Sequence, residues 1–192
     1  DRYHAILRQV FGRHQGEVLS RRLLPQYLAE LRTLVAENYS LGDESVPLIH
    51  RNFLTLAREN FYLRLAKVVK EEVAWAEQTV GCFTPKYLEL GFGGIKKEAD
   101  PASTAQPLVL TDGQDNRQTP PLRLWGKIDR VDTDQEGRFI IYDYKSGNPP
   151  QVKAIKERQL LQLPLYMLAV GRLFLPTGEP VGAAYYSLKQ AE

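Results

Sequence analysis

The spacing of the apolar residues changes near residue 80 of this chain. Before that point they recur every three or four residues, as in Ile6, Leu7, Val10 and Phe11. After it, several short segments alternate apolar and polar residues. The first spacing is typical of amphipathic helices and the second of half-buried strands. A chain that begins with helices and continues with strands is expected to fold as an α/β (α+β) domain with a small mixed sheet.

Three N-terminal helices are expected, over residues 3–11, 17–38 and 47–80. Pro25 lies inside the second helical pattern and is expected to kink or split it, whereas Pro47 suits the first turn of the third helix. The apolar stripe of the third helix is formed by Ile49, Phe53, Ala57, Phe61, Leu65, Val69 and Val73.

The second part of the chain is expected to contain strands over residues 86–92, 122–132, 138–145 and 182–188, with a helix over 152–175. Asp134-Gln135-Glu136-Gly137 is typical of a hairpin turn. Residues 98–121 are rich in loop-forming residues and are expected to form a flexible insert. We therefore expect a single domain over residues 1–192, with a helical part at 1–80 and a sheet-containing core at 84–192.

Composition excludes several classes of protein. The chain has 192 residues, of which 43% are hydrophobic, so it can bury a real core. A net charge of +2 is too small to indicate nucleic-acid binding by itself. Cys82 is the one cysteine, which rules out an internal disulfide or an all-thiolate metal site and favours an intracellular setting. We expect Cys82 to be a buried apolar side chain.

No apolar run is long enough for a membrane span, and no signal-peptide pattern opens the chain. Because the sequence starts at Asp1, within a helical pattern, we expect it to be a piece of a longer protein.

Two acidic residues and a lysine stand out in the expected hairpin. Alternation places Asp143 and Lys145 on one face of the second strand. If the strands pair through the 134–137 turn, Asp129 and Asp143 point toward the same end of the sheet. Two carboxylates in a partly dry site repel each other, and a Mg²⁺ ion removes that conflict. The plainer interpretation is a solvent-exposed hairpin end carrying a surface ion pair, which contributes at most about 1 kcal/mol.

Three sequence strings resemble the PD-(D/E)XK nuclease superfamily, with a restriction-endonuclease-like core of a small mixed sheet flanked by helices. They are Gly126-Lys127-Ile128-Asp129-Arg130-Val131-Asp132, then Ile141-Tyr142-Asp143-Tyr144-Lys145-Ser146-Gly147, then Gln159-Leu160-Leu161-Gln162-Leu163-Pro164-Leu165-Tyr166. They are most similar to the RecB and AddB type nuclease domains of bacterial helicase–nucleases. Tyr3-His4-Ala5-Ile6-Leu7 resembles the helix of that family that carries a metal-binding histidine.

The resemblance implies a role for each matching residue. Asp129 and Asp143 would bind the metal, Mg²⁺ or Mn²⁺, with the backbone carbonyl of Tyr144 and the imidazole of His4 as further ligands. Lys145 would be the catalytic lysine. The helix residues Gln162 and Tyr166 would face the site and orient the lysine and the DNA. Glu89 resembles an upstream strand glutamate of the family, for which we expect a place in the site without direct coordination.

The chain departs from the family pattern in two places. Ile128 precedes the first aspartate where the family name has proline. Related domains often hold an iron–sulfur cluster on four cysteines, and Cys82 alone cannot support one in this chain.

Local charge and aromatic residues are consistent with a DNA partner. Lys145, Lys153, Lys156 and Arg158 lie near the expected site, and the third helix carries Arg51, Arg58, Arg64, Lys67 and Lys70. Phosphate contacts dominate nucleic-acid affinity, although such charges also occur on any solvated helix. Tyr142, Tyr144 and Trp125 are candidates for base stacking or for ordinary packing in the sheet.

These expectations lead to a metal-dependent DNA nuclease, an exonuclease of a DNA-repair and recombination complex in the bacterial cytoplasm. ATP would be bound by a helicase domain or subunit, since the chain has no Walker motif. One alternative is a non-catalytic nucleic-acid-binding scaffold of the same fold. Another is a glycosidase with a carboxylate pair, which the neighbouring lysine argues against.

Overall fold

The computed structural model describes residues 2–39, 47–79, 82–94, 99–111, 120–147, 150 and 160–188. The chain divides into two compact units. Unit 1 comprises Asp1–Cys82, Tyr144–Pro149 and Ser187–Glu192, and unit 2 comprises Phe83–Asp143 and Pro150–Tyr186.

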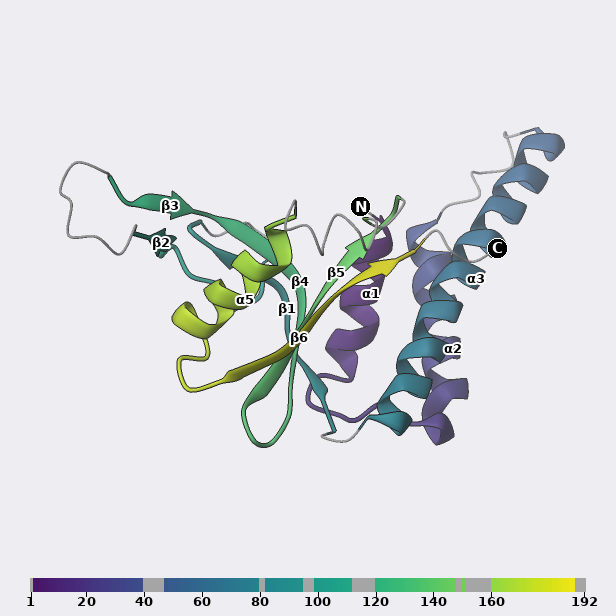
Figure 1. The fold of residues 1–192 in the computed structure, drawn as a ribbon. Helices are drawn as coiled ribbons and strands as arrows, with labels where there is room; N and C mark the ends of the chain where they lie inside the picture. Colours follow the sequence, from purple (N-terminus) through teal and green to yellow (C-terminus); the bar gives the residue numbers. More distant parts are fainter. Residues whose placement is uncertain are drawn as a thin grey trace. The chain divides into compact units, whose positions relative to one another are not determined.

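Unit 1 is built from helices (Figure 1). They are α1 (Arg2–Arg13), the 3₁₀ turn η1 (Arg21–Leu23), α2 (Leu24–Asn38) and α3 (Leu48–Gln78). Helix α2 packs against both α1 and α3. The rings of Tyr3 and Phe61 lie 4.3 Å apart and join α1 to α3. The apolar face of each helix is therefore turned toward its neighbours, as the helical spacing predicts.

Pro25 starts a helix instead of kinking one. The expected helix over residues 17–38 is replaced by η1 and by α2, which begins at Leu24 and has Pro25 in its first turn. A proline costs nothing there, because the first helical N–H groups have no partner within the helix and the fixed φ of proline suits a helix.

The predicted apolar stripe of α3 is buried only in its second half. Phe61, Leu65 and Val69 are buried, whereas Ile49 and Phe53 are 76% and 69% exposed. The reason is length: α3 has 31 residues and α2 has 15, so α2 cannot cover α3 from end to end. None of the helices in the described ranges is both long and apolar enough to cross a membrane.

Unit 2 contains a four-stranded sheet in the order β1-β4-β5-β6. The strands are β1 (Thr84–Phe92), β4 (Gly126–Thr133), β5 (Arg138–Lys145) and β6 (Glu179–Ser187). The pairs β1–β4 and β4–β5 are antiparallel, and β5 and β6 point the same way in Figure 1, so the sheet is mixed. Helix α5 (Gln162–Leu173) supplies Leu163, Ala169 and Val170 to a core shared with sheet residues such as Ile141. The predicted fold class, a mixed α/β domain consistent with a restriction-endonuclease-like core, is confirmed.

The hairpin forms as predicted, through a turn at residues 134–137. The Asp134 N–H donates to the Arg138 carbonyl, and Gly137 has the positive φ of 81° that such a turn requires of its last residue. The turn fixes the register of the two strands, so that Val131 pairs with Ile141 and Arg130 with Tyr142.

Two other predicted elements have different bounds in the structure. The predicted strand 122–132 is divided into β3 (Leu122–Leu124) and β4 at Trp125. The predicted helix 152–175 is described from Gln162 to Leu173 only. Lys153, Lys156 and Arg158 lie outside the described residues, and so does most of the predicted start of that helix.

The expected insert, residues 98–121, is described over 99–111 and 120–121. Its apolar run forms β2 (Leu108–Leu110), which pairs with β3 in a two-stranded sheet. Residues 100–104, which precede β2, form hydrogen bonds with β1.

Cys82 is exposed, and the prediction that it is buried is wrong. It lies in the link between α3 and β1, with a positive φ of 46°. A residue in such a link belongs to the apolar face of neither element, so nothing requires it to be buried.

Candidate active site

Three carboxylates lie in one row across three adjacent strands of unit 2. Leu88 pairs with Arg130 and Leu90 with Ile128, so Glu89 on β1 is opposite Asp129 on β4. On the other side, Arg130 pairs with Tyr142, and the next position of the same register places Asp129 opposite Asp143 on β5. Directly opposite residues have Cβ atoms about 5 Å apart. The hairpin turn and the β1–β4 register thus bring together acidic residues that are far apart in the sequence.

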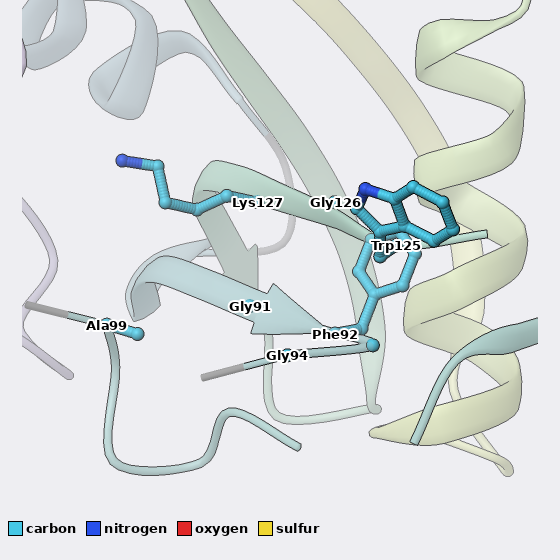
Figure 2. A pocket seen from close by; sticks show the side chains of 8 residues that line it. Gly91, Phe92, Gly94, Ala99, Trp125, Gly126 and Lys127 are labelled. Atoms are coloured by element: carbon cyan, nitrogen blue, oxygen red, sulfur yellow. The ribbon is translucent and has the colours of Figure 1, made fainter. Parts of the chain in front are cut away.

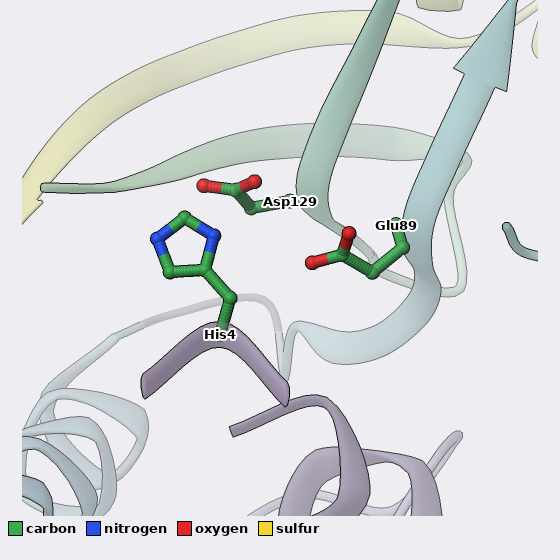
Figure 3. Close-up of side chains that lie close together, drawn as sticks. All are labelled: His4, Glu89 and Asp129. Atoms are coloured by element: carbon green, nitrogen blue, oxygen red, sulfur yellow. The ribbon is translucent and has the colours of Figure 1, made fainter. Parts of the chain in front are cut away.

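The carboxylates of Glu89 and Asp129 lie close together (Figure 3). Their oxygen atoms lie within 4.8 Å of one another, and both residues are only 8% exposed. Like charges directly opposite each other in a sheet destabilise it, and burial increases the repulsion. The arrangement therefore favours a positive partner between the two groups.

Lys127 supplies one positive charge in this row. Its Nζ forms an ion pair with Glu89 Oε2. Gly91, two residues beyond Glu89 on β1, is the register partner of Lys127. The lysine side chain remains 40% exposed, so its ammonium group can also meet a ligand from solvent.

Glu89 has an unusual backbone for a strand residue, with a φ of 61°. A non-glycine residue with positive φ is strained, and the surrounding structure must hold it in place. Residues 100–104 of the expected insert do so along the outer edge of β1. The Asp100 N–H donates to the Glu89 carbonyl at 3.1 Å, and the Asp100 carboxylate accepts the Leu88 N–H at 2.9 Å. Ser103 Oγ accepts the Gly91 N–H at 2.9 Å.

Asp143 is held by side chains from α5. Gln162 Nε2 donates to Asp143 Oδ1 at 2.8 Å and to the Tyr166 hydroxyl at 3.2 Å. The spacing of four residues places Gln162 and Tyr166 on one helix face. Burial, followed by the Asp143 carboxylate, raises the pKa of Tyr185. Its hydroxyl therefore stays protonated and donates to Gln162 Oε1 at 3.5 Å. This network leaves the amide of Gln162 one orientation, with its NH₂ group toward Asp143.

His4 and Tyr144 meet within unit 1. His4 Nε2 lies 3.0 Å from the Tyr144 carbonyl oxygen, and His4 projects from α1 (Figure 3). Because a carbonyl only accepts, Nε2 carries the proton when this contact is a hydrogen bond, and it can bind a metal only once that proton is lost. Tyr144 directly follows Asp143 on β5, and Lys145 comes two residues after Asp143, so strand alternation gives Asp143 and Lys145 the same face.

These residues fit a hard divalent cation. The carboxylates of the row in unit 2 are oxygen donors, the kind that Mg²⁺ and Mn²⁺ prefer. Two neighbouring ligands of an octahedral Mg²⁺ ion, each about 2.1 Å from it, are about 3 Å apart. The 3.0 Å separation of His4 Nε2 and the Tyr144 oxygen equals that spacing and is also an ordinary hydrogen-bond length. The close and buried pair of Glu89 and Asp129 agrees with a need for positive charge.

The chain matches the PD-(D/E)XK nuclease superfamily over residues 1–192. It belongs to this superfamily, whose members use divalent metals, and the sheet, α5 and the row of acidic residues are in keeping with that assignment. No curated protein matches the chain.

The structure gives two residues contacts in the site that the sequence did not predict. A carboxylate oxygen of Glu89 lies close enough to Asp129 for both residues to bind one metal ion. The sequence predicted a place in the site for Glu89 but no direct coordination. Lys127 contacts Glu89, and its only signal in the sequence was its position in the string that precedes Asp129. Of the aromatic candidates for stacking, Tyr142 and Tyr144 are buried, whereas Trp125 is 76% exposed.

Proposed function

We propose that this chain is a metal-dependent deoxyribonuclease that hydrolyses phosphodiester bonds. The observation that carries the proposal is the row of Glu89, Asp129 and Asp143 on adjacent strands, in a chain that belongs to a nuclease superfamily. Three acidic side chains in register are costly for the sheet alone, and they become useful when they hold a cation next to a DNA phosphate.

We assign metal binding to Asp129, Asp143, the Tyr144 carbonyl and His4, with Glu89 as an additional ligand. His4 is included because its ring nitrogen lies at the Tyr144 carbonyl, one residue after Asp143. Mg²⁺ or Mn²⁺ bound there would supply Lewis-acid stabilisation of charge on the scissile phosphate and a water of lowered pKa.

The remaining residues orient the reacting groups. Lys145 shares a strand face with Asp143, and its ammonium group stabilises negative charge as it develops on the phosphate. Gln162 fixes the rotamer of Asp143 through the 2.8 Å hydrogen bond. Tyr166 supports Gln162 through its hydroxyl. Gln162 and Tyr166 are therefore positioning residues in this scheme.

The cellular setting is proposed from the sequence resemblance to RecB and AddB type domains. In that setting the chain acts as an exonuclease on DNA ends, together with a helicase domain or subunit, in double-strand-break repair and recombination in the bacterial cytoplasm. No iron–sulfur cluster is proposed for it, because Cys82 is its one cysteine.

The alternative proposal is a scaffold of the same fold that binds nucleic acid without cutting it. Such a domain has no use for a lysine two residues after the acidic residue of β5, or for an amide that holds this carboxylate at 2.8 Å. These two features favour the enzyme.

The test is cleavage of end-labelled linear DNA, single-stranded and duplex, with Mg²⁺, Mn²⁺ or EDTA. We expect cleavage with either metal and none in EDTA. Asp143→Asn and Lys145→Ala should each lower the rate at least about 100-fold, the usual cost of removing one group that stabilises a transition state. Circular dichroism should show that both variants fold.

Two matched substitutions serve as controls. Glu136→Gln removes an exposed carboxylate in the hairpin turn, and Lys86→Ala removes an exposed ammonium group near the start of β1. Both should cleave at the rate of the unmodified chain. Cleavage that persists in EDTA, or that survives in Asp143→Asn, would show that the proposed chemistry is wrong.

A further inference from the structure

A cavity of about 210 Å³ lies in unit 2, where β1 ends and β4 begins (Figure 2). It is lined by Gly91, Phe92, Gly93, Gly94, Ala99, Trp125, Gly126 and Lys127. The lining combines an exposed indole, a cationic side chain and a glycine-rich wall. None of the roles assigned above to the metal ligands or to Lys145 requires this cavity.

The cavity wall depends on glycine. A Cβ atom at Gly126 would come within 2.8 Å of the Phe92 ring and 3.1 Å of the Tyr166 ring. Gly93 has a φ of 76°, and a Cβ atom there would come within 2.5 Å of Trp125 Cβ. The backbone thus packs directly against the aromatic residues, and the wall beside Trp125 stays free of side chains. A flat ring fits such a space better than a branched group does.

Trp125 is placed for contact with a ligand. Its side chain is 76% exposed, although it stands between two strands and next to the buried Phe92. An exposed indole at the mouth of an apolar cavity loses hydrophobic energy unless something covers it. Every nucleobase has a π face that stacks on an indole.

Two connections join the cavity to the carboxylate row. Lys127 lines the cavity and forms an ion pair with Glu89. The Phe92 ring lies edge-to-face with Tyr166, at 6.2 Å between centroids, and Tyr166 accepts a hydrogen bond from Gln162, which holds Asp143. Gly91 is two residues from Glu89, about 7 Å along the strand. A base in the cavity would therefore belong to a nucleotide whose phosphate is near the acidic row.

We infer that the cavity binds one unpaired nucleobase of the DNA strand presented to the acidic row. The base stacks on Trp125, and Lys127 meets an adjacent phosphate. A paired base has its faces covered by its neighbours in the duplex, so only a single strand or a frayed end can fill the cavity. The inference rests on the proposed function in one respect, that the ligand is DNA.

The test uses the intrinsic fluorescence of Trp125. The chain has two tryptophans, and Trp75→Phe on α3 leaves Trp125 as the single reporter. This protein is titrated in EDTA with an oligothymidylate, with the same strand made of abasic sites, and with a blunt duplex. We expect quenching by the oligothymidylate alone. Quenching of equal size by the abasic strand would assign the contact to phosphate and overturn the inference.

Affinity gives the second readout. Trp125→Ala should weaken binding of the oligothymidylate about 5- to 100-fold, the range expected for the loss of one stacked base. Duplex binding should not change. Ala99→Leu, which narrows the cavity and leaves the indole in place, should weaken oligothymidylate binding in the same direction. Leu122→Ala removes an apolar side chain that is 57% exposed on β3, and it should leave binding unchanged.

Binding without metal separates this inference from the proposed activity. Quenching by single strands in a protein that cuts no DNA would support the base site and count against the nuclease. Metal-dependent cleavage by a protein whose Trp125 does not respond to single strands would support the nuclease and overturn the base site. Equal affinity of Trp125→Ala and the unmodified chain for the oligothymidylate would also overturn it.

Discussion

The backbone of Glu89 is strained at the position where its carboxylate lies opposite Asp129. Its φ of 61° lies in a region where a non-glycine residue costs about 1–3 kcal/mol. Hydrogen bonds from the Asp100 segment hold the backbone on both sides of it. Such strain persists where the side chain has a use, and here the side chain stands opposite Asp129.

Two substitutions at this position separate strain from charge. Glu89→Ala and Glu89→Gly remove the same carboxylate, but only glycine accepts the positive φ without strain. We expect Glu89→Gly to be more stable than Glu89→Ala by about 1 kcal/mol. Urea unfolding in EDTA measures the difference. If the alanine variant were the more stable of the two, Glu89 would not carry the strain that its φ indicates.

At the scale of elements, the β4–β5 hairpin sets the register of the acidic row, and Asp134 stabilises its turn. Asp134 Oδ1 accepts the N–H groups of Glu136 and Arg138 at 3.0 and 2.9 Å. Its Oδ2 accepts Arg138 Nε at 2.6 Å. Burial alone would raise the pKa of Asp134, but the hydrogen bonds from Arg138 outweigh it and lower the pKa below the ordinary 3.8.

This lowered pKa predicts a pH dependence of stability. The charged form of Asp134 is favoured in the folded state, so its contribution is present above about pH 4 and is lost as the pH falls through the lowered pKa. Asp134→Asn should be less stable than the unmodified chain at neutral pH, and the difference should shrink below about pH 4. Urea unfolding of both proteins from about pH 7 down to about pH 3 measures it. A difference that grows on acidification would contradict this assignment.

The β4 strand also contains a buried ion pair that explains two residues of its sequence string. Arg130 Nε and Nη2 donate to Asp132 at 2.6 and 2.5 Å, and the two side chains are 2% and 1% exposed. The guanidinium group of Arg130 lies over the Tyr142 ring, 4.8 Å from its centroid. Arg130 and Asp132 therefore neutralise each other's buried charge within the strand that presents Asp129, and they need no catalytic role.

Removing one member of this pair should cost more than removing both. Asp132→Ala leaves a buried arginine without its carboxylate and should lower the free energy of unfolding by about 3–5 kcal/mol. The double variant Arg130→Met, Asp132→Leu buries no charge and should lose less. Urea unfolding tests both proteins. If the double variant were as unstable as Asp132→Ala, the cost would come from lost packing rather than from an unpaired charge.

At the scale of the whole molecule, the fold class and the hairpin could be predicted from the sequence because they depend on local patterns. Alternation along 138–145 and the turn at 134–137 are sufficient to bring Asp129 and Asp143 toward the same end of the sheet. The three- to four-residue spacing of apolar residues before residue 80 likewise predicted the helices of unit 1. The helical period did not predict that Ile49 and Phe53 are exposed. Their exposure follows from the lengths of the helices, since α2 is too short to cover the first half of α3.

Other features depend on contacts between distant segments and could not be predicted. Glu89 joins the row because of the β1–β4 register and because Asp100 holds its backbone. The exposure of Trp125 follows from the division of the predicted strand into β3 and β4. Gln162 was recognised through the family resemblance, but its hydrogen bond to Asp143 needed the fold.

The central claim is that the acidic row holds a divalent cation, and calorimetric titration of Mn²⁺ into the intact chain tests it most directly. We predict binding by the unmodified chain and at least tenfold weaker binding by Asp129→Asn, a near-isosteric change that removes one charge from the middle of the row. Circular dichroism should be the same for both proteins. If Asp129→Asn bound Mn²⁺ as tightly as the unmodified chain, the acidic row would not be the metal site.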